Sequence, residues 1–113
     1  MKTASLYKGV RYHAEKPSVE VILESDFSRE IRIAFKENQR MKEHKSRYPI
    51  IVQLAEGSLD FGVNGQVLSM EKGDMICLEG GVPHDLHALS DSIVRLSISI
   101  RDHSERVKAV ANL

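Results

Sequence analysis

The chain has 113 residues, which is long enough for one domain with a modest core and too short for two. Its 16 basic and 16 acidic side chains cancel, so it lacks the concentrated excess of Lys and Arg that phosphate binding needs, and we expect no nucleic-acid partner. Nothing approaches the roughly 20 apolar residues of a membrane helix, and residues 1–12 contain no apolar stretch of signal-peptide length. We expect a cytoplasmic protein that does not bind a membrane.

Short segments of β-branched and apolar residues follow one another along the chain and are separated by turn residues. The segments expected as strands are residues 19–23, 30–35, 41–46, 50–55, 59–63, 66–70, 75–78, 84–89 and 93–100. Asn64-Gly65 joins two of them and is the strongest hairpin signal in the chain. Many short strands with regular turns predict an all-β sandwich or barrel.

Helical periodicity is absent until the end of the chain. Asp102 could cap a helix there, and Glu105 lies three residues on, at the spacing of a capping box. Residues 102–113 are therefore expected to be a tail that forms a short helix, with Val107 and Val110 on one side. No linker, repeat or low-complexity segment divides the chain.

Cys77 is the one cysteine of the chain and cannot form an internal disulfide, which fits a reducing compartment. On its strand Met75 and Cys77 alternate with Ile76 and Leu78, so one of the two pairs faces the interior. Because a reactive thiol needs an electropositive, partly exposed setting, we expect Cys77 to be a buried structural thiol.

Turn glycines and two histidines recur in order between residues 41 and 88. Along the chain they read His44, Leu54-Ala55-Glu56-Gly57, Leu59-Asp60-Phe61-Gly62-Val63-Asn64-Gly65, Gly73-Asp74, Glu79-Gly80-Gly81 and His84. In this order and spacing, the stretch resembles the two motifs of the cupin family and the segment that joins them. The resemblance implies a cupin-type antiparallel β-barrel, also called a jelly roll or double-stranded β-helix, over a single domain of residues 1–113.

The glycines of this stretch have a physical reason to be where they are. Those expected at tight reversals with positive φ are Gly57, Gly65, Gly73 and Gly81. Glycine has no Cβ and adopts positive φ without a steric penalty. The fold prediction therefore depends on turn chemistry as well as on the family likeness.

The metal site of the family, which has three histidines and one glutamate, is incomplete here by this resemblance. Its positions correspond to His44, Ser46, Ile50 and His84. The two histidines are kept as metal ligands, Ser46 is a weak third, and Ile50 stands at the carboxylate position. A serine hydroxyl is a poor ligand for a transition metal, and two imidazoles fall short of a triad of two histidines and one carboxylate. We expect an optional divalent transition metal (Zn, Ni, Fe or Mn) at low occupancy, and otherwise no cofactor.

The alternation of side chains along a strand decides whether nearby residues could complete the metal-ligand set. Asp85 and His87 lie at odd offsets from His84 and are expected on the opposite face of the strand. Glu43 precedes the first histidine and is expected to point outward unless a bulge intervenes. Glu79, in the loop before the second histidine, could turn inward and restore a carboxylate.

The same alternation predicts a largely apolar pocket around the two histidines. The residues expected to line it are Ser46, Ile50, Val52, Leu54, Phe61, Leu86 and Ala88, with Arg32 or Gln53 at its edge. An apolar lining with a few polar groups is typical of small-molecule sites. The alternative is that these side chains fill the barrel as a core and leave little cavity.

Three functions remain open, and the sequence does not decide whether the protein is an enzyme. The first is binding of a small molecule in the apolar pocket, with the metal optional. The second is a metal-dependent oxygenase or isomerase that uses His44 and His84 as ligands. The third is a metal-free, epimerase-like enzyme in which one histidine acts as general base.

The open sheet edges of such a fold need covering, and cupins commonly cover them by pairing. We therefore expect a homodimer. A strand around residues 6–12 is the candidate for that pairing.

Overall fold

The structure is a computed structural model of the chain, and it describes residues 1–100. Within this range the chain consists of strands, turns and irregular segments, with no helix. The strands are β1 (Ser18–Glu24), β2 (Ser28–Phe35), β3 (Arg40–His44), β4 (Ile50–Glu56), β5 (Ser58–Val63), β6 (Gln66–Glu71), β7 (Met75–Leu78), β8 (His84–Ala88) and β9 (Ser92–Ser99). They confirm the predicted strands, with shifts of no more than two residues at either end. The helix expected over residues 102–113 lies outside the described residues.

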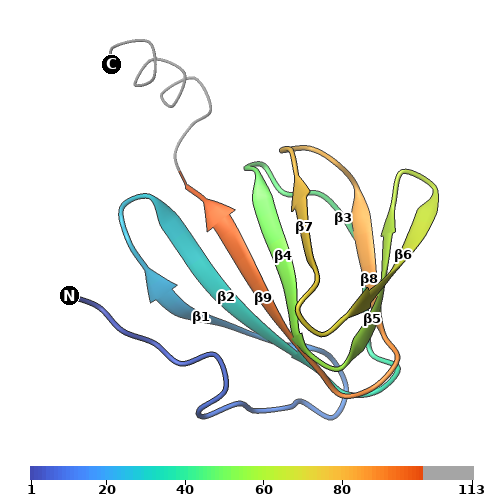
Figure 1. Cartoon of the computed structure of the whole chain (residues 1–113), viewed down its shortest axis with the longest axis horizontal. Coiled ribbons are helices and arrows are strands. Elements are labelled where there is room, and N and C mark those ends of the chain that lie inside the picture. The colour runs from blue at the N-terminus through green and yellow to red at the C-terminus, as the bar shows by residue number, and fades with distance from the viewer. Residues whose placement is uncertain (101–113) are drawn as a thin grey trace.

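Two antiparallel sheets make up the jelly roll. One has five strands in the order β1-β2-β9-β4-β7, and the other has four in the order β3-β8-β5-β6. In Figure 1 the β1–β2 hairpin lies at one side of the molecule and β6 at the other. Strand β9 is central to the larger sheet, where it pairs with β2 on one side and β4 on the other. The all-β fold expected from the sequence is confirmed.

The core lies between the two sheets. Alternation along each strand directs every second side chain inward, where it meets side chains of the opposite sheet. The fully or almost fully buried members are Ile31, Ile33, Phe35, Ile50, Val52, Leu54, Leu59, Phe61, Met70, Leu78, Leu86, Ala88 and Val94. Both sheets contribute large side chains, so the interior is filled over most of its length.

Tight reversals connect the strands and depend on glycine. The glycines Gly57, Gly65, Gly73 and Gly81 all have positive φ, as the sequence predicts. Asn64 and Gly65 have φ values of 52° and 73°, which is the type I′ geometry that suits a two-residue hairpin between β5 and β6. At Gly57 space matters as well, because a Cβ there would clash with Oγ of Ser92.

An irregular N-terminal segment, residues 1–17, packs on the outer face of β2. Its carbonyl groups are held by Arg32, whose guanidinium donates hydrogen bonds to the backbone oxygens of Lys8 (2.9 Å) and Gly9 (3.2 Å). The same guanidinium forms an ion pair of 2.6 Å with Glu20. The strand expected around residues 6–12 is therefore wrong, because the segment bonds to an arginine side chain and not to a sheet edge.

The expected directions of three further side chains are wrong. Arg32 does not lie at the pocket edge, because the inward positions of β2 belong to its apolar neighbours and the guanidinium faces outward. Gln53 also lies on the outer face, beside Met75 and Arg95. Cys77 is exposed, because Ile76 and Leu78 take the inward positions of β7.

Candidate functional site

His44 and His84 come together where β3 ends and β8 begins. They are antiparallel partners in the smaller sheet, and their ring centroids are 4.4 Å apart with an interplanar angle of 61°. A bulge places His44 there. Met41 pairs with Leu86, so three steps along β3 match two along β8, and both Met41 and His44 line the interior.

The hydrogen bonds of the two imidazoles set where each ring carries its proton. Nδ1 of His44 lies 2.7 Å from the carbonyl oxygen of Lys42, and Nδ1 of His84 lies 2.9 Å from that of Val82. A carbonyl oxygen can only accept, so each Nδ1 is the protonated nitrogen. In the neutral rings both Nε2 atoms are then unprotonated acceptors. Neither Nε2 has a hydrogen-bond partner among the described residues.

The environments of the two histidines differ. His84 is only 4% exposed, and its ring is stacked on that of Phe61, with centroids 5.6 Å apart and planes 7° from parallel. His44 is exposed. One imidazole therefore sits inside the barrel and the other at its mouth.

A cavity of about 100 Å³ adjoins the pair. It is lined by Val19, Ile33, Met41, His44, Val52, His84, Leu86, Val94 and Leu96. Apart from the two imidazoles these side chains are apolar. Sites for drug-sized ligands usually measure about 300–1,000 Å³, and a water occupies about 30 Å³. The cavity therefore has room for roughly three or four non-hydrogen atoms.

The side chains that the sequence predicts for the pocket divide into two groups. Val52 and Leu86 line the cavity beside the histidines. Ile50, Leu54, Phe61 and Ala88 are buried in the core and lie outside its lining. Ser46 is half-buried, and its Oγ accepts a hydrogen bond from the backbone of Tyr48 at 3.3 Å.

Sequence reasoning missed several lining residues for identifiable reasons. Met41 reaches the interior because of the bulge, and no residue pattern predicts that bulge. Val19 lies on the edge strand β1, is 56% exposed, and borders the cavity where the smaller sheet does not cover the larger one. Ile33, Val94 and Leu96 could have been found, because the alternation of their strands already directs them inward.

The donors present do not fit a resident metal held by the protein alone. Glu79 is exposed. Glu43, Asp85 and His87 line a surface groove on β3 and β8 and are not among the residues that line the cavity. Within residues 1–100 there is no group of three or more His, Cys, Asp or Glu side chains placed to bind a metal. Protein zinc sites use three or four such ligands, and this site offers two imidazoles.

Comparison with known proteins identifies the fold family. A family model described as a cupin domain matches residues 32–101, more than half of the chain. The chain belongs to the cupin domain family. A search of curated proteins found no match.

Several solved structures resemble this cupin. An RmlC-like cupin from Desulfovibrio desulfuricans is 24% identical, with a TM-score of 0.81, and the match covers 88% of this chain and 96% of that one. KdgF from Halomonas sp. is 12% identical, with a TM-score of 0.74 and coverage of 92% and 99%. A Klebsiella pneumoniae protein with a double-stranded β-helix domain is 18% identical, with a TM-score of 0.75 and coverage of 88% and 90%. At these identities the likeness concerns the fold alone. Within the described residues of this cupin, no helix is long and apolar enough to cross a membrane.

Proposed function

We propose that this cupin binds a compact small molecule whose hydrogen-bond-donating group lies between His44 and His84. The observation that carries the proposal is the proton placement of the pair. Both Nδ1 protons are engaged by backbone carbonyls, so both Nε2 atoms accept. Among the residues that the structure describes, no other polar side chain lines the cavity beside them.

This arrangement favours a particular ligand chemistry. An alcohol or a primary amine can donate to one or both Nε2 atoms, while a short alkyl body fills the apolar cavity. A carboxylate brings only acceptors and would face two acceptors, an arrangement that leaves lone pairs unsatisfied. A longer ligand would extend past His44 into solvent, because that side of the site is open.

Titration with matched probes tests this function. Isobutanol, isobutylamine and isobutyrate share a branched alkyl body and differ in their head groups. We expect the first two to shift the NMR signals of residues around the cavity at millimolar concentration, with isobutyrate at least about tenfold weaker, a difference of about 1.4 kcal/mol. Equal binding of isobutyrate would contradict the proposal.

Variants make the same test sharper. His44→Ala removes one of the two acceptors, at an exposed position, and should reduce the difference between the probes without unfolding the protein. Ser46→Ala is the matched control, since its hydroxyl lies outside the cavity lining and should leave binding unchanged. Probe binding that is the same in both variants would rule out recognition by the histidine pair.

A metal-dependent function is the second candidate, and one observation favours it. Metal-bound histidines usually donate their other ring N–H to a carbonyl or carboxylate, as both histidines do here. An external ligand would have to supply the missing donors. Elemental analysis of protein purified without chelator checks this. Less than about a tenth of an equivalent per chain, with no thermal stabilisation by added Zn(II), Ni(II), Fe(II) or Mn(II), would exclude it.

The acid–base alternative receives less support. A general-base histidine is usually oriented by a carboxylate on its second nitrogen. Here the second nitrogen of each histidine bonds to a backbone carbonyl.

A further inference from the structure

The apolar floor of the interior cavity continues sideways onto the inner face of β1. Val19 of β1 lines the cavity directly. In the next row of side chains across the sheet, Leu96 lines the cavity and pairs with Ile31, which in turn pairs with Val21. Paired residues of antiparallel strands point to the same face of a sheet, so Val21 lies on the same apolar surface as the cavity floor.

This side of the floor is open among the described residues. β1 is an edge strand of the five-stranded sheet, and β3, which carries Met41 and His44, is an edge strand of the other sheet. Val19 and Val21 are 56% and 52% exposed, although they point to the inner face. Residues 1–100 therefore leave an apolar surface beside the cavity, formed by Val19 and Val21, which we call the β1 strip.

We propose that this cupin also accepts unbranched aliphatic alcohols or primary amines, whose alkyl chain leaves the cavity between β1 and β3 and lies on the β1 strip. The inference rests on the proposed function, because the head group still donates to the pair of His44 and His84. A polar extension of the ligand is best placed past His44 in water. An alkyl extension gains more from the β1 strip, since Val19 belongs to both the cavity and the strip.

The dimensions of the β1 strip set the length of the alkyl chain. Two residues along a strand span about 6.6 Å, and roughly five carbons cover that distance. With the roughly three or four non-hydrogen atoms that the cavity holds, head group included, the ligand has about seven or eight carbons. Full burial of a methylene strengthens binding about fourfold. Because the strip contacts the alkyl chain on one side only, we expect about twofold for each methylene.

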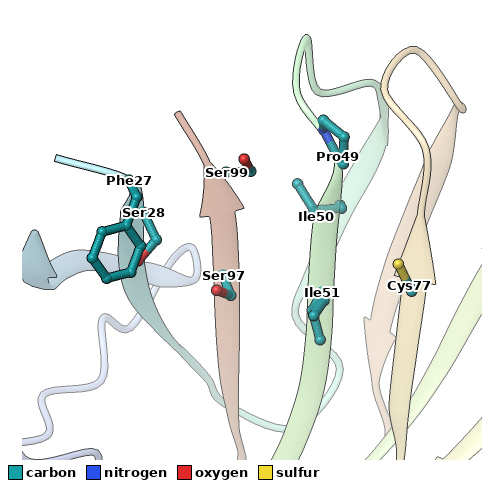
Figure 2. Close-up of a pocket in the computed structure, with 8 residues that line it drawn as sticks. All are labelled: Phe27, Ser28, Pro49, Ile50, Ile51, Cys77, Ser97 and Ser99. Carbon is teal, nitrogen blue, oxygen red and sulfur yellow. The ribbon is translucent and has the colours of Figure 1, made fainter. Parts of the chain in front are cut away.

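A second apolar surface has to be distinguished from the β1 strip as a place for an alkyl chain. A groove of about 370 Å³ lies on the outer face of the five-stranded sheet. Figure 2 shows Phe27 on one side of this groove and Ile51 on the other. The groove shares no lining residue with the interior cavity. An alkyl chain bound in the groove would therefore depend on Phe27 and not on Val21.

Binding of a series of alcohols to the full chain tests the assignment. Dissociation constants are measured by NMR titration for 1-butanol, 1-pentanol, 1-hexanol and 1-heptanol, and for heptanoate as the head-group control. We expect affinity to rise about twofold per methylene, which is about eightfold over the series. The methyl signals of Val21 should shift with 1-heptanol and not with 1-butanol.

The two axes of this experiment separate the alkyl path from the head-group site. Equal affinity throughout the series, with 1-heptanol still preferred over heptanoate, would overturn the alkyl path and leave the proposed function standing. Equal binding of 1-heptanol and heptanoate, with the rise along the series intact, would contradict the head-group site and support the alkyl path.

Three variants at positions more than half exposed locate the alkyl chain without disturbing the core. Val21→Asp puts a charge on the β1 strip and should reduce the ratio of affinities for 1-heptanol and 1-butanol to about twofold or less. Val67→Asp puts the same charge on β6, an edge strand of the other sheet, and Phe27→Asp puts it in the outer groove. Both should keep the wild-type ratio.

Three results with these proteins would overturn the proposal. One is a ratio that survives Val21→Asp, and another is a ratio that is lost in Phe27→Asp, which would place the alkyl chain in the outer groove. The third is a wild-type ratio that falls as the protein concentration rises, because a second copy of the chain would then cover the β1 strip.

Discussion

The two halves of the outer face of the five-stranded sheet invert the usual relation between polarity and burial. On β2 the charged residues Glu30 and Arg32 are only 8% and 4% exposed. On β4 and β7 the apolar residues Ile51 and Met75 are 40% and 59% exposed. The difference arises from what lies over each half. An irregular segment with many unpaired carbonyls needs donors beneath it, and the guanidinium of Arg32 supplies them.

Two arginines on β2 show how much the cover matters. Arg32 pairs with Glu20 at 2.6 Å, and Arg29 pairs with Glu24 at 2.5 Å, both across the β1–β2 hairpin. The side chain of Arg32 is 5% exposed and that of Arg29 is 43% exposed. The two ion pairs join the same strands and have nearly the same length, and both glutamates are about half exposed, so the pairs differ mainly in the burial of the arginine.

The largest effect is expected for Arg32→Ala. Removing the buried guanidinium leaves several backbone carbonyls without their donor, while the half-exposed carboxylate of Glu20 can be hydrated, so we expect a cost of about 2–3 kcal/mol. Denaturation in urea measures the free energy of unfolding, and limited proteolysis should show faster cleavage within residues 1–17. Arg29→Ala is the control and should cost about 1 kcal/mol or less. Equal losses of unfolding free energy in the two variants would show that the burial of the arginine does not determine its contribution to stability.

Glu30→Gln should have a smaller and pH-dependent effect. Burial by itself would raise the pKa of Glu30, but hydrogen bonds from Ser97, Ser28 and Arg95 outweigh it and lower the pKa below its ordinary value. The carboxylate therefore contributes stability that is complete above the unfolded pKa of about 4.3 and is lost as the pH falls through the folded pKa.

At neutral pH we expect Glu30→Gln to cost about 1–2 kcal/mol. The difference from the wild type should shrink below about pH 4, where both proteins carry a neutral side chain at this position. Urea denaturation across the acidic range gives the measurement. A loss of stability that is constant with pH would mean that the charge of Glu30 contributes nothing.

The smallest effect is expected in the half that residues 1–100 leave uncovered. Met75→Ser changes a side chain that is 59% exposed, and stability should change by no more than about 0.5 kcal/mol. Ile76→Ser, on the next residue of β7, changes a side chain packed against the core and should cost about 1–3 kcal/mol. A large loss in Met75→Ser would indicate that this position is covered after all.

The sequence predicted the strands well because their signals are local. Alternating apolar residues, the Asn64-Gly65 turn and glycines at reversals each act over a few residues. The prediction that Cys77 is buried was wrong because burial of one face is not a local signal. On a short strand with apolar residues at every position, alternation gives two faces but does not say which one is inside.

The candidate site was predictable only in outline. The cupin motif positions indicate His44 and His84 as a pair, and the register brings them together. The bulge before His44, the carbonyl that fixes each ring and the small volume of the cavity depend on packing between distant segments. None of these leaves a pattern in the residues themselves. The sequence also does not predict that Arg32 binds the N-terminal segment, because that segment has no periodic pattern.

The central place of β9 in the larger sheet has a consequence for synthesis on the ribosome. Of the described strands β9 emerges last, yet it separates β2 from β4 and pairs with both. Until residues 92–99 are available, the nascent sheet is in two pieces, and each piece presents a long unpaired strand edge. Folding through such distant contacts is slow, and exposed edges invite association with other nascent chains. The strand that completes the barrel is thus also the one that ends this vulnerable period.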